Sequence, residues 1–152
     1  MSLDAVASAA VVWLAAMGTG DAMKPEHAAP PPSVALEPLF ADIVKRAGAL
    51  KAEVDALQQN GQALPADFAK KIAELSELDM KGHVTLAQRG TDGDLKCILK
   101  GISEDLPVKL EAMQAAEGDR AKSDAVTDMS YLLRDNVEVI TTPPKADSLS
   151  GT

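Results

Sequence analysis

The side chains best suited to metal binding or nucleophilic chemistry in this sequence are two histidines and one cysteine, His27, His83 and Cys97. Zinc sites usually take their ligands from pairs separated by only a few residues. These three residues lie far apart, on a proline-rich linker, at the end of one predicted helix and inside another. The spacing therefore predicts no metal site. A lone cysteine on or beside an apolar helix stripe is expected to behave as a small buried hydrophobic residue.

Calcium binding and phosphate binding are the next chemistries to consider. Asp92-Gly93-Asp94 has the acidic spacing that opens a calcium loop, but Lys96 stands where the third ligand belongs and no glycine follows it. The stretch from Gly90 to Gly93 lacks the lysine that a phosphate-binding loop requires, and no strand leads into it. A turn that caps the following helix accounts for all of these residues.

One acidic pair has the spacing for general acid–base catalysis. Asp124 and Asp128 are four residues apart, so a helix places them on one face. Two like charges in this arrangement slightly destabilise a helix, and a solvated surface is their expected place. We therefore expect no catalytic residue, no cofactor and no enzyme. Catalytic residues gathered from distant helices would leave no local pattern, which keeps a small helical enzyme as an alternative.

Helices are the elements that must position these side chains. Hydrophobic residues make up 46% of the chain but aromatic residues only 3%, so the core consists of aliphatic residues, and the abundant alanine and leucine favour helices. The clearest predicted helix covers residues 36–58, with Ser33 as a candidate cap and Asn60-Gly61 as its end. Its apolar residues alternate steps of four and three, the seam of a coiled coil or bundle helix. The predicted interaction residues on this seam are Leu36, Phe40, Ile43, Leu50, Val54 and Leu57.

Three further amphipathic segments follow the first helix. A helix from Pro65 to about residue 88 weakens at Gly82, and a third helix after residues 91–92 meets Pro107, which either kinks it or opens a new segment. A last helix covers residues 123–136, and residues 137–142 are rich in β-branched side chains and favour a short extended end. Four such segments with short connections predict an all-α antiparallel bundle over residues 34–140.

The two flanks of the predicted bundle differ in composition. Residues 1–23 predict an apolar N-terminal helix, residues 24–33 a proline-rich linker and residues 141–152 a disordered tail. The apolar run at residues 5–17 is shorter than the ~20 residues that span a membrane. Asp4 precedes it without a basic residue, which argues against a secretory signal. A helix docked on the bundle or on a second subunit is expected, and docking on a membrane surface is the weakest alternative because the run lacks a polar face.

One stretch of the third helix, Cys97-Ile-Leu99-Lys100-Gly101-Ile-Ser103, resembles the motif around the phosphorylated histidine of histidine-containing phosphotransfer domains. Those domains are helical bundles in which the lysine and glycine after the histidine let a receiver domain approach. The resemblance covers about ten residues, and Cys97 replaces the histidine itself. It implies a degenerate relative that docks a receiver or kinase domain without accepting phosphate.

The net charge and the composition of the chain limit the kinds of molecule that it can bind. The formal net charge of −8 repels nucleic acid, and the few aromatic residues provide no platform for stacking bases. The single cysteine fits a reducing compartment, which favours a cytoplasmic protein. We therefore expect a non-enzymatic interaction, adaptor or assembly protein that forms a homo-oligomer, a dimer, through the first helix. The alternatives are the degenerate phosphotransfer-like bundle and an envelope-associated protein held by residues 5–17.

Overall fold

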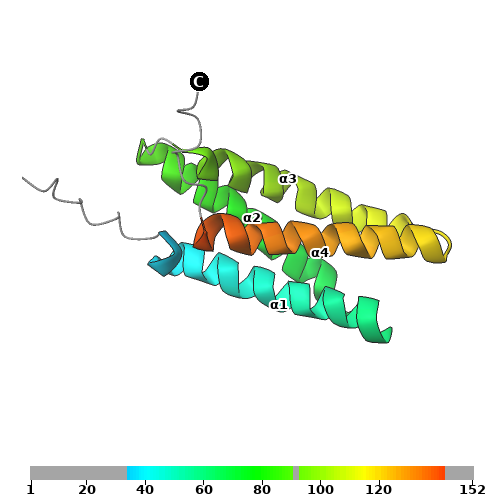
Figure 1. Cartoon of the computed structure of the whole chain (residues 1–152). Coiled ribbons are helices and arrows are strands. Elements are labelled where there is room, and N and C mark those ends of the chain that lie inside the picture. The colour runs from blue at the N-terminus through cyan, green and yellow to red at the C-terminus, as the bar shows by residue number, and fades with distance from the viewer. Residues whose placement is uncertain (1–33, 91–92, 143–152) are drawn as a thin grey trace, which may run out of the picture. The chain divides into compact units, whose positions relative to one another are not determined.

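The computed structural model describes residues 34–90 and 93–142 of the 152-residue chain. The described residues form one short 3-10 helix, η1 (Val34–Leu36), and four α-helices (Figure 1). These are α1 (Pro38–Asn60), α2 (Phe68–Gln88), α3 (Asp94–Ala115) and α4 (Asp119–Thr141). The fold is an all-α bundle, as the sequence predicts. The apolar N-terminal helix, the proline-rich linker and tail residues 143–152 lie outside the described residues.

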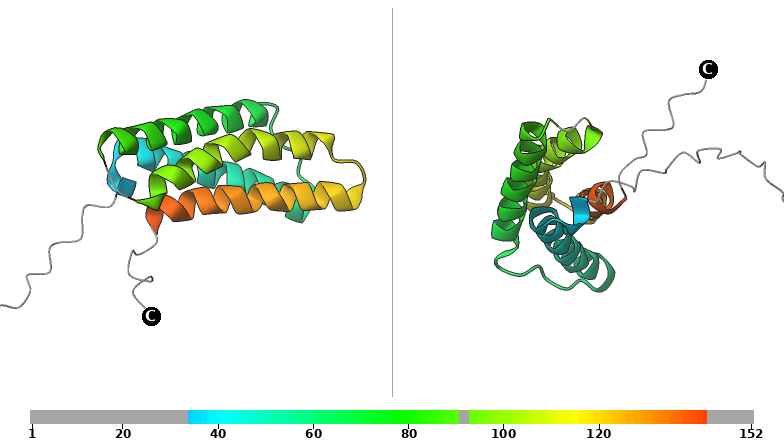
Figure 2. Two further views of the ribbon diagram at one scale, coloured as in Figure 1. Left: turned by 90° about the horizontal axis from the view of Figure 1, so that it is seen from above. Right: turned by 90° about the vertical axis from the view of Figure 1, so that its left-hand side faces the viewer.

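The four helices form two antiparallel pairs. Helix α2 packs along α3, and α1 packs along α4 (Figure 2). The pairs face each other through contacts of α1 with α2 and of α3 with α4, so α2 and α4 lie diagonally across the core. At one end of the bundle α1 and α3 begin while α2 and α4 finish, and we call it the closed end. We call the opposite end, where α1 and α3 finish, the pocket end.

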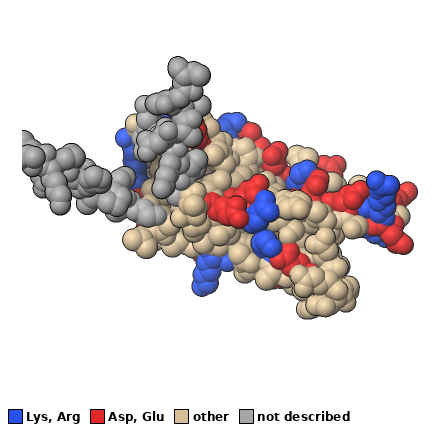
Figure 3. Space-filling model, viewed as in Figure 1, with Lys and Arg blue, Asp and Glu red and all other residues tan. Residues whose placement is uncertain are grey.

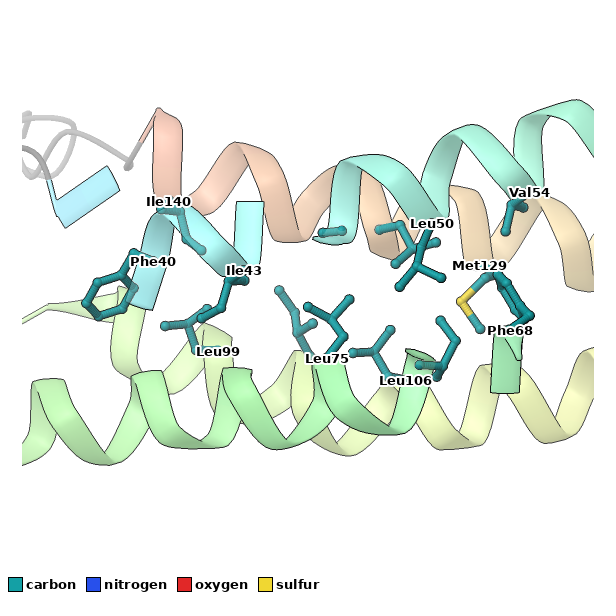
Figure 4. Packing of buried hydrophobic residues seen from close by; sticks show 14 of the residues in the cluster. Phe40, Ile43, Leu50, Val54, Phe68, Leu75, Leu99, Leu106, Met129 and Ile140 are labelled. Carbon is teal, nitrogen blue, oxygen red and sulfur yellow. The ribbon is translucent and has the colours of Figure 1, made fainter. Parts of the chain in front are cut away.

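The core is mostly aliphatic, as the composition predicts, with two phenylalanines among its residues (Figure 4). Each fully buried Leu, Ile, Val, Met or Phe stabilises the fold by roughly 1.5–3 kcal/mol. The residues of this core come from all four helices and are Phe40, Ile43, Ala47, Leu50, Val54, Phe68, Ile72, Leu75, Leu86, Leu99, Ile102, Leu106, Val126, Met129, Leu133 and Ile140. No helix in the described part of the chain has the length and apolar character to cross a membrane.

The boundaries of α1 follow local chemistry. Pro38 occupies the first turn, where its missing N–H costs nothing, and Glu37 is the N-cap residue. The predicted cap Ser33 lies outside the described residues. Gly61 adopts the left-handed conformation at φ 63°, and its N–H donates to the Leu57 carbonyl. The predicted end of the helix at Asn60-Gly61 is therefore confirmed.

The predicted weakness of the second helix at Gly82 is wrong, because α2 runs through this residue without interruption. A Cβ at Gly82 would lie 3.1 Å from Leu99 Cδ1 and 3.3 Å from Phe40 Cε1. The absence of a side chain therefore lets α1 and α3 pack closely on α2. The predicted start of this helix at Pro65 is also wrong, because α2 begins at Phe68, after a turn.

Helix α3 continues through Pro107, so of the two alternatives predicted there, a kink or a new segment, the new segment is wrong. Proline has no N–H, which removes the helical hydrogen bond to the carbonyl four residues earlier, at Ser103. The Ser76 hydroxyl donates to that carbonyl over 2.7 Å, and the Ser103 hydroxyl donates to the Ser76 carbonyl over 2.8 Å. A reciprocal serine pair between α2 and α3 thus replaces the bond that Pro107 cannot make.

The predicted limits of the last helix are too short at both ends. Helix α4 starts at Asp119, directly after Gly118 in the left-handed region at φ 84°, and continues to Thr141. The extended end predicted for residues 137–142 is wrong. Ile140 is fully buried in the core, and its burial favours the helical continuation over the extended preference of β-branched residues.

Candidate functional site

The predicted interaction seam divides into buried and accessible residues. Four of its six side chains, Phe40, Ile43, Leu50 and Val54, are buried in the core of their own chain. In the folded bundle these four cannot also form a seam with another chain. Leu36 lies in η1 and is 81% exposed, while Leu57 is partly buried at the end of α1.

A pocket of about 690 Å³ lies at the pocket end of the bundle. All four helices and the α1–α2 connection contribute to its wall. The lining residues are Leu57, Gln58, Leu64, Pro65, Ala66, Phe68, Ala69, Leu110, Met113, Gln114, Ala116, Lys122, Ser123 and Val126. Exposed residues such as Gln58 and Gln114 form part of this wall, so the pocket opens to solvent. Its volume falls within the roughly 300–1,000 Å³ of ligand and side-chain pockets in proteins.

The pocket lining carries little charge for so acidic a chain. Its lining contains no aspartate or glutamate, and Lys122 is its single charged residue. Residues 56–66, which end α1 and lead into α2, contain no charged side chain at all. In Figure 3 the end of α1 forms a surface without charged side chains, whereas charged residues line α3 and α4. This character suits an apolar occupant, since no carboxylate must be desolvated when the pocket is filled.

A polar pair lies inside the apolar core. Asp79 of α2 and Asn136 of α4 are both fully buried, and the Asn136 amide Nδ2 donates to Asp79 Oδ2 over 2.7 Å. Burial raises the pKa of the Asp79 carboxyl to about 7, and the hydrogen bond from Asn136 only partly opposes this shift. The core thus holds an acid that titrates near neutrality, an environment often found at functional sites.

Two carboxylates nearer the surface have the opposite shift. Glu37, before α1, accepts hydrogen bonds from both terminal nitrogens of Arg89 at the end of α2, over 2.8 and 2.6 Å. These bonds hold the pKa of Glu37 below its usual value. Asp55 of α1 accepts hydrogen bonds from Lys51 and from the Ser130 hydroxyl of α4, which lower its pKa in the same way. As ions, both carboxylates connect two helices: Glu37 joins the start of α1 to the end of α2, and Asp55 joins α1 to α4.

The residues singled out for chemistry do not form a joint site. Cys97 is exposed, so the prediction of a small buried cysteine is wrong. Cys97 is two residues before Leu99 on α3, and two residues turn a helix by about 200°, so Cys97 points away from the core that Leu99 enters. His83 donates its Nδ1 proton to the Lys96 carbonyl over 2.6 Å, since a carbonyl only accepts. His27 and Asp92 lie outside the described residues. Within residues 34–90 and 93–142, no three metal-binding side chains gather.

The predicted acidic surface pair lies on the outside of α4. Asp124 and Asp128 are both exposed. Asp128 accepts a hydrogen bond from Lys109 of α3 over 2.9 Å, and Asp124 lies 3.9 Å from Arg120. The expectation of a solvated face is confirmed.

Sequence reasoning missed the Asp79–Asn136 pair, although the spacing contains a signal for it. The buried residues of α2 alternate steps of four and three from Phe68 to Leu86, and this register passes through Asp79 and Gly82. On α4 the same register passes through Asn136. Residue type alone favours their apolar neighbours Leu78 and Val137 for the core, but these two side chains are only partly buried.

Comparison with known proteins assigns no function to these residues, because no family model, no curated protein and no solved structure matches the chain.

Proposed function

We propose that this chain is a non-enzymatic protein that binds another protein, and that the pocket end of the bundle is its docking site. The observation that carries the proposal is the open pocket of about 690 Å³, lined by apolar side chains of all four helices. Four of the six seam residues are already buried in the core, whereas the pocket keeps partly buried apolar side chains of α1, α3 and the α1–α2 connection accessible together. Apolar pockets rimmed by polar residues are typical of protein interaction sites.

The partner fitted by this site is a protein segment with apolar anchor side chains and no acidic group at the contact. Leu57, Leu110 and Met113 supply partly buried apolar surface, and the glutamines at positions 58 and 114 supply neutral hydrogen-bonding groups. An apolar anchor would displace water from this surface at a gain of roughly 25 cal/mol per Å². Charge attraction contributes little, because Lys122 alone carries a charge in the lining.

Site-specific photo-crosslinking in the native source tests the proposal. A photoreactive amino acid at Gln58 or Gln114 should give the same single adduct, and the same probe at exposed Lys45 on α1 should not. The substitution Met113→Asp, which puts a charge into the pocket wall, should abolish the adduct and leave the helical circular dichroism unchanged. Identical adducts from all three positions, or an adduct insensitive to Met113→Asp, would contradict the docking site.

The dimer remains a second outcome of this experiment. Of the predicted seam only Leu36 and Leu57 are accessible while the bundle is folded. An adduct at twice the 15.9 kDa chain mass would identify a second copy as the occupant of the pocket.

The same proposal includes a cytoplasmic location, a helical N-terminal segment over residues 1–23 and a disordered tail. It also includes the absence of nucleic-acid partners. The alternative of an envelope association through residues 5–17 concerns a segment outside the described residues.

Docking of a receiver domain on α3 is a second candidate function, and one observation favours it. Cys97 and Lys100 are exposed, and a Cβ at Gly101 would meet nothing within 4 Å. This is the open helix face that the resemblance to phosphotransfer domains implies. A photoreactive probe at Lys100 should then capture a receiver or kinase domain, and Gly101→Arg should prevent it. An adduct from Gln58 but not from Lys100 favours the pocket instead.

A further inference from the structure

The buried pair Asp79–Asn136 has an unusual balance of acceptors and donors. The amide Nδ2 of Asn136 donates to Asp79 Oδ2, but Oδ1 of Asp79 and Oδ1 of Asn136 have no hydrogen-bonding partner among the described residues. Both atoms are closed off from solvent. Buried polar atoms are nearly always hydrogen bonded, because an unsatisfied one loses its interaction with water and gains nothing in return.

A single proton satisfies both oxygens. An ionised carboxylate and an amide oxygen are acceptors only, whereas a protonated carboxyl also donates. We propose that Asp79 is protonated in the folded protein in mildly acidic to neutral solution, and that its O–H donates to Asn136 Oδ1 while Asn136 Nδ2 donates to Asp79 Oδ2. The acid and the amide then form two reciprocal hydrogen bonds across the core. This inference is independent of the proposed docking site.

The surroundings of Asp79 favour the neutral form. One turn along α2, a Cβ at Gly82 would lie 3.1 Å from Leu99 of α3, 3.3 Å from Phe40 and 3.4 Å from Ile43 of α1, so the neighbourhood is apolar. The charged or titratable side chains that the four helices carry near this level have other partners. Arg46 of α1 pairs with Asp42 and Glu74, His83 of α2 binds the Lys96 carbonyl, Lys100 of α3 pairs with Glu104, and Arg134 of α4 pairs with Asp135. None of these groups contributes to the pKa of Asp79, which burial raises to about 7.

The pair links the two halves of the bundle. Helices α2 and α4 lie on a diagonal and do not pack directly on each other, so this bond joins the α2–α3 pair to the α1–α4 pair through the core. Ionisation would remove the carboxyl O–H and leave a charge between apolar side chains. The neutral Asp79 carboxyl therefore stabilises the contact between the two helix pairs, and the folded bundle becomes less stable as the pH rises through the pKa of Asp79.

The sign of the pH dependence follows from proton linkage. The folded chain keeps a proton at Asp79 up to about pH 7, whereas the unfolded chain releases it near the ordinary value of 3.8. Within this window folding binds one proton, so the equilibrium constant for unfolding rises about tenfold per pH unit and levels off above it. Between pH 5 and pH 7 the expected rise is about fiftyfold, because Asp79 is already half ionised at pH 7.

Asp79→Asn is the matched variant, because the asparagine has the same shape and its amide can make both hydrogen bonds at every pH. Urea denaturation of the wild type and of Asp79→Asn between pH 5 and pH 8 gives the two unfolding constants. Every other titratable group is the same in both proteins, so the ratio of the constants isolates Asp79. We expect this ratio to change about fiftyfold between pH 5 and pH 7. A ratio that stays constant would overturn the proposal.

Nuclear magnetic resonance measures the same proton without any variant. In the folded wild type labelled with ¹³C at aspartate Cγ, one carboxyl resonance should titrate with a midpoint near 7. A set in which every aspartate titrates below pH 5 would mean that Asp79 is ionised inside the core, and the proposal would be wrong. This measurement decides the question even if Asp79→Asn does not fold.

Discussion

The two ends of the bundle are built from the same four helices but differ in how fully they bury their side chains. At the closed end Phe40, Leu99 and Ile140 have no exposed surface. Glu37 and Arg89 fasten the start of α1 to the end of α2 on the outside. At the pocket end, by contrast, Leu57 and Met113 are only partly buried and line an open pocket.

The difference has an identifiable cause in the α1–α2 contact. Gly82 lets α1 and α3 come close to α2 at the closed end. At the other end residues 61–67 connect α1 to α2 without a helix, and this connection lines the pocket. The seam spacing of α1 is the same at both ends. Heptad spacing therefore indicates which face of a helix is apolar, while the size of the facing side chains decides whether that face is filled.

The strongest test of this comparison places a charge at each end. Ile43→Asp puts an unpartnered carboxylate into the closed half of the core, where it should cost about 4 kcal/mol or more and unfold the chain. Met113→Asp, in the pocket wall, should change the unfolding free energy by about 1 kcal/mol or less. Circular dichroism during thermal unfolding measures both. A folded monomer from Ile43→Asp would support the seam between chains that the spacing of α1 predicts.

Removal of one leucine at each end gives a finer comparison. Leu99→Ala leaves a cavity among fully packed neighbours and should cost about 2–5 kcal/mol. Leu57→Ala enlarges a pocket that water already reaches, so its cost should stay near 1 kcal/mol. Urea denaturation of both variants provides the values. Equal losses would mean that the two ends are packed alike and that the pocket closes in solution.

The serine pair of α2 and α3 lies between the two ends and can be tested with a double-mutant cycle. Ser76→Ala leaves the Ser103 carbonyl without a donor and should cost about 1–3 kcal/mol. In a Pro107→Ala background the restored helical N–H reaches that carbonyl, so the same substitution should cost less. Losses of equal size in the two backgrounds would show that Pro107 is unrelated to the serine pair.

The smallest expected effect is at the ion pair that fastens the closed end. The lowered pKa of Glu37 means that its contribution to stability is present above about pH 4.5 and disappears as the pH falls through the folded value. Glu37→Gln should therefore lower the melting temperature slightly at pH 7 and by less at pH 3. Glu111→Gln, on the exposed side of α3, is the matched control and should have no effect at either pH. A loss of the same size at pH 3 as at pH 7 would show that the side chain matters through packing rather than through its charge.

Local chemistry in the sequence determined the fold class and several helix boundaries. The aliphatic composition and the four-three spacing predicted a helical bundle, and Asn60-Gly61 predicted the end of α1. These features act within a few residues: a glycine can adopt the left-handed conformation wherever it stands, and a helix presents one face every three or four residues. They can therefore be recognised before any tertiary contact is known.

Tertiary structure alone decided which residues of that register enter the core. The buried positions of α2 and α4 include Asp79, Gly82 and Asn136, whose residue types do not suggest a core position. A carboxyl group is tolerated in a core only when a partner such as the Asn136 amide reaches it from another helix. Cys97 was predicted to be buried, but the rotation of α3 that buries Leu99 leaves it exposed. The pocket, too, depends on how α1 and α2 meet across seven connecting residues. Each outcome depends on the distance and orientation of a second helix, and no spacing within one helix contains that information.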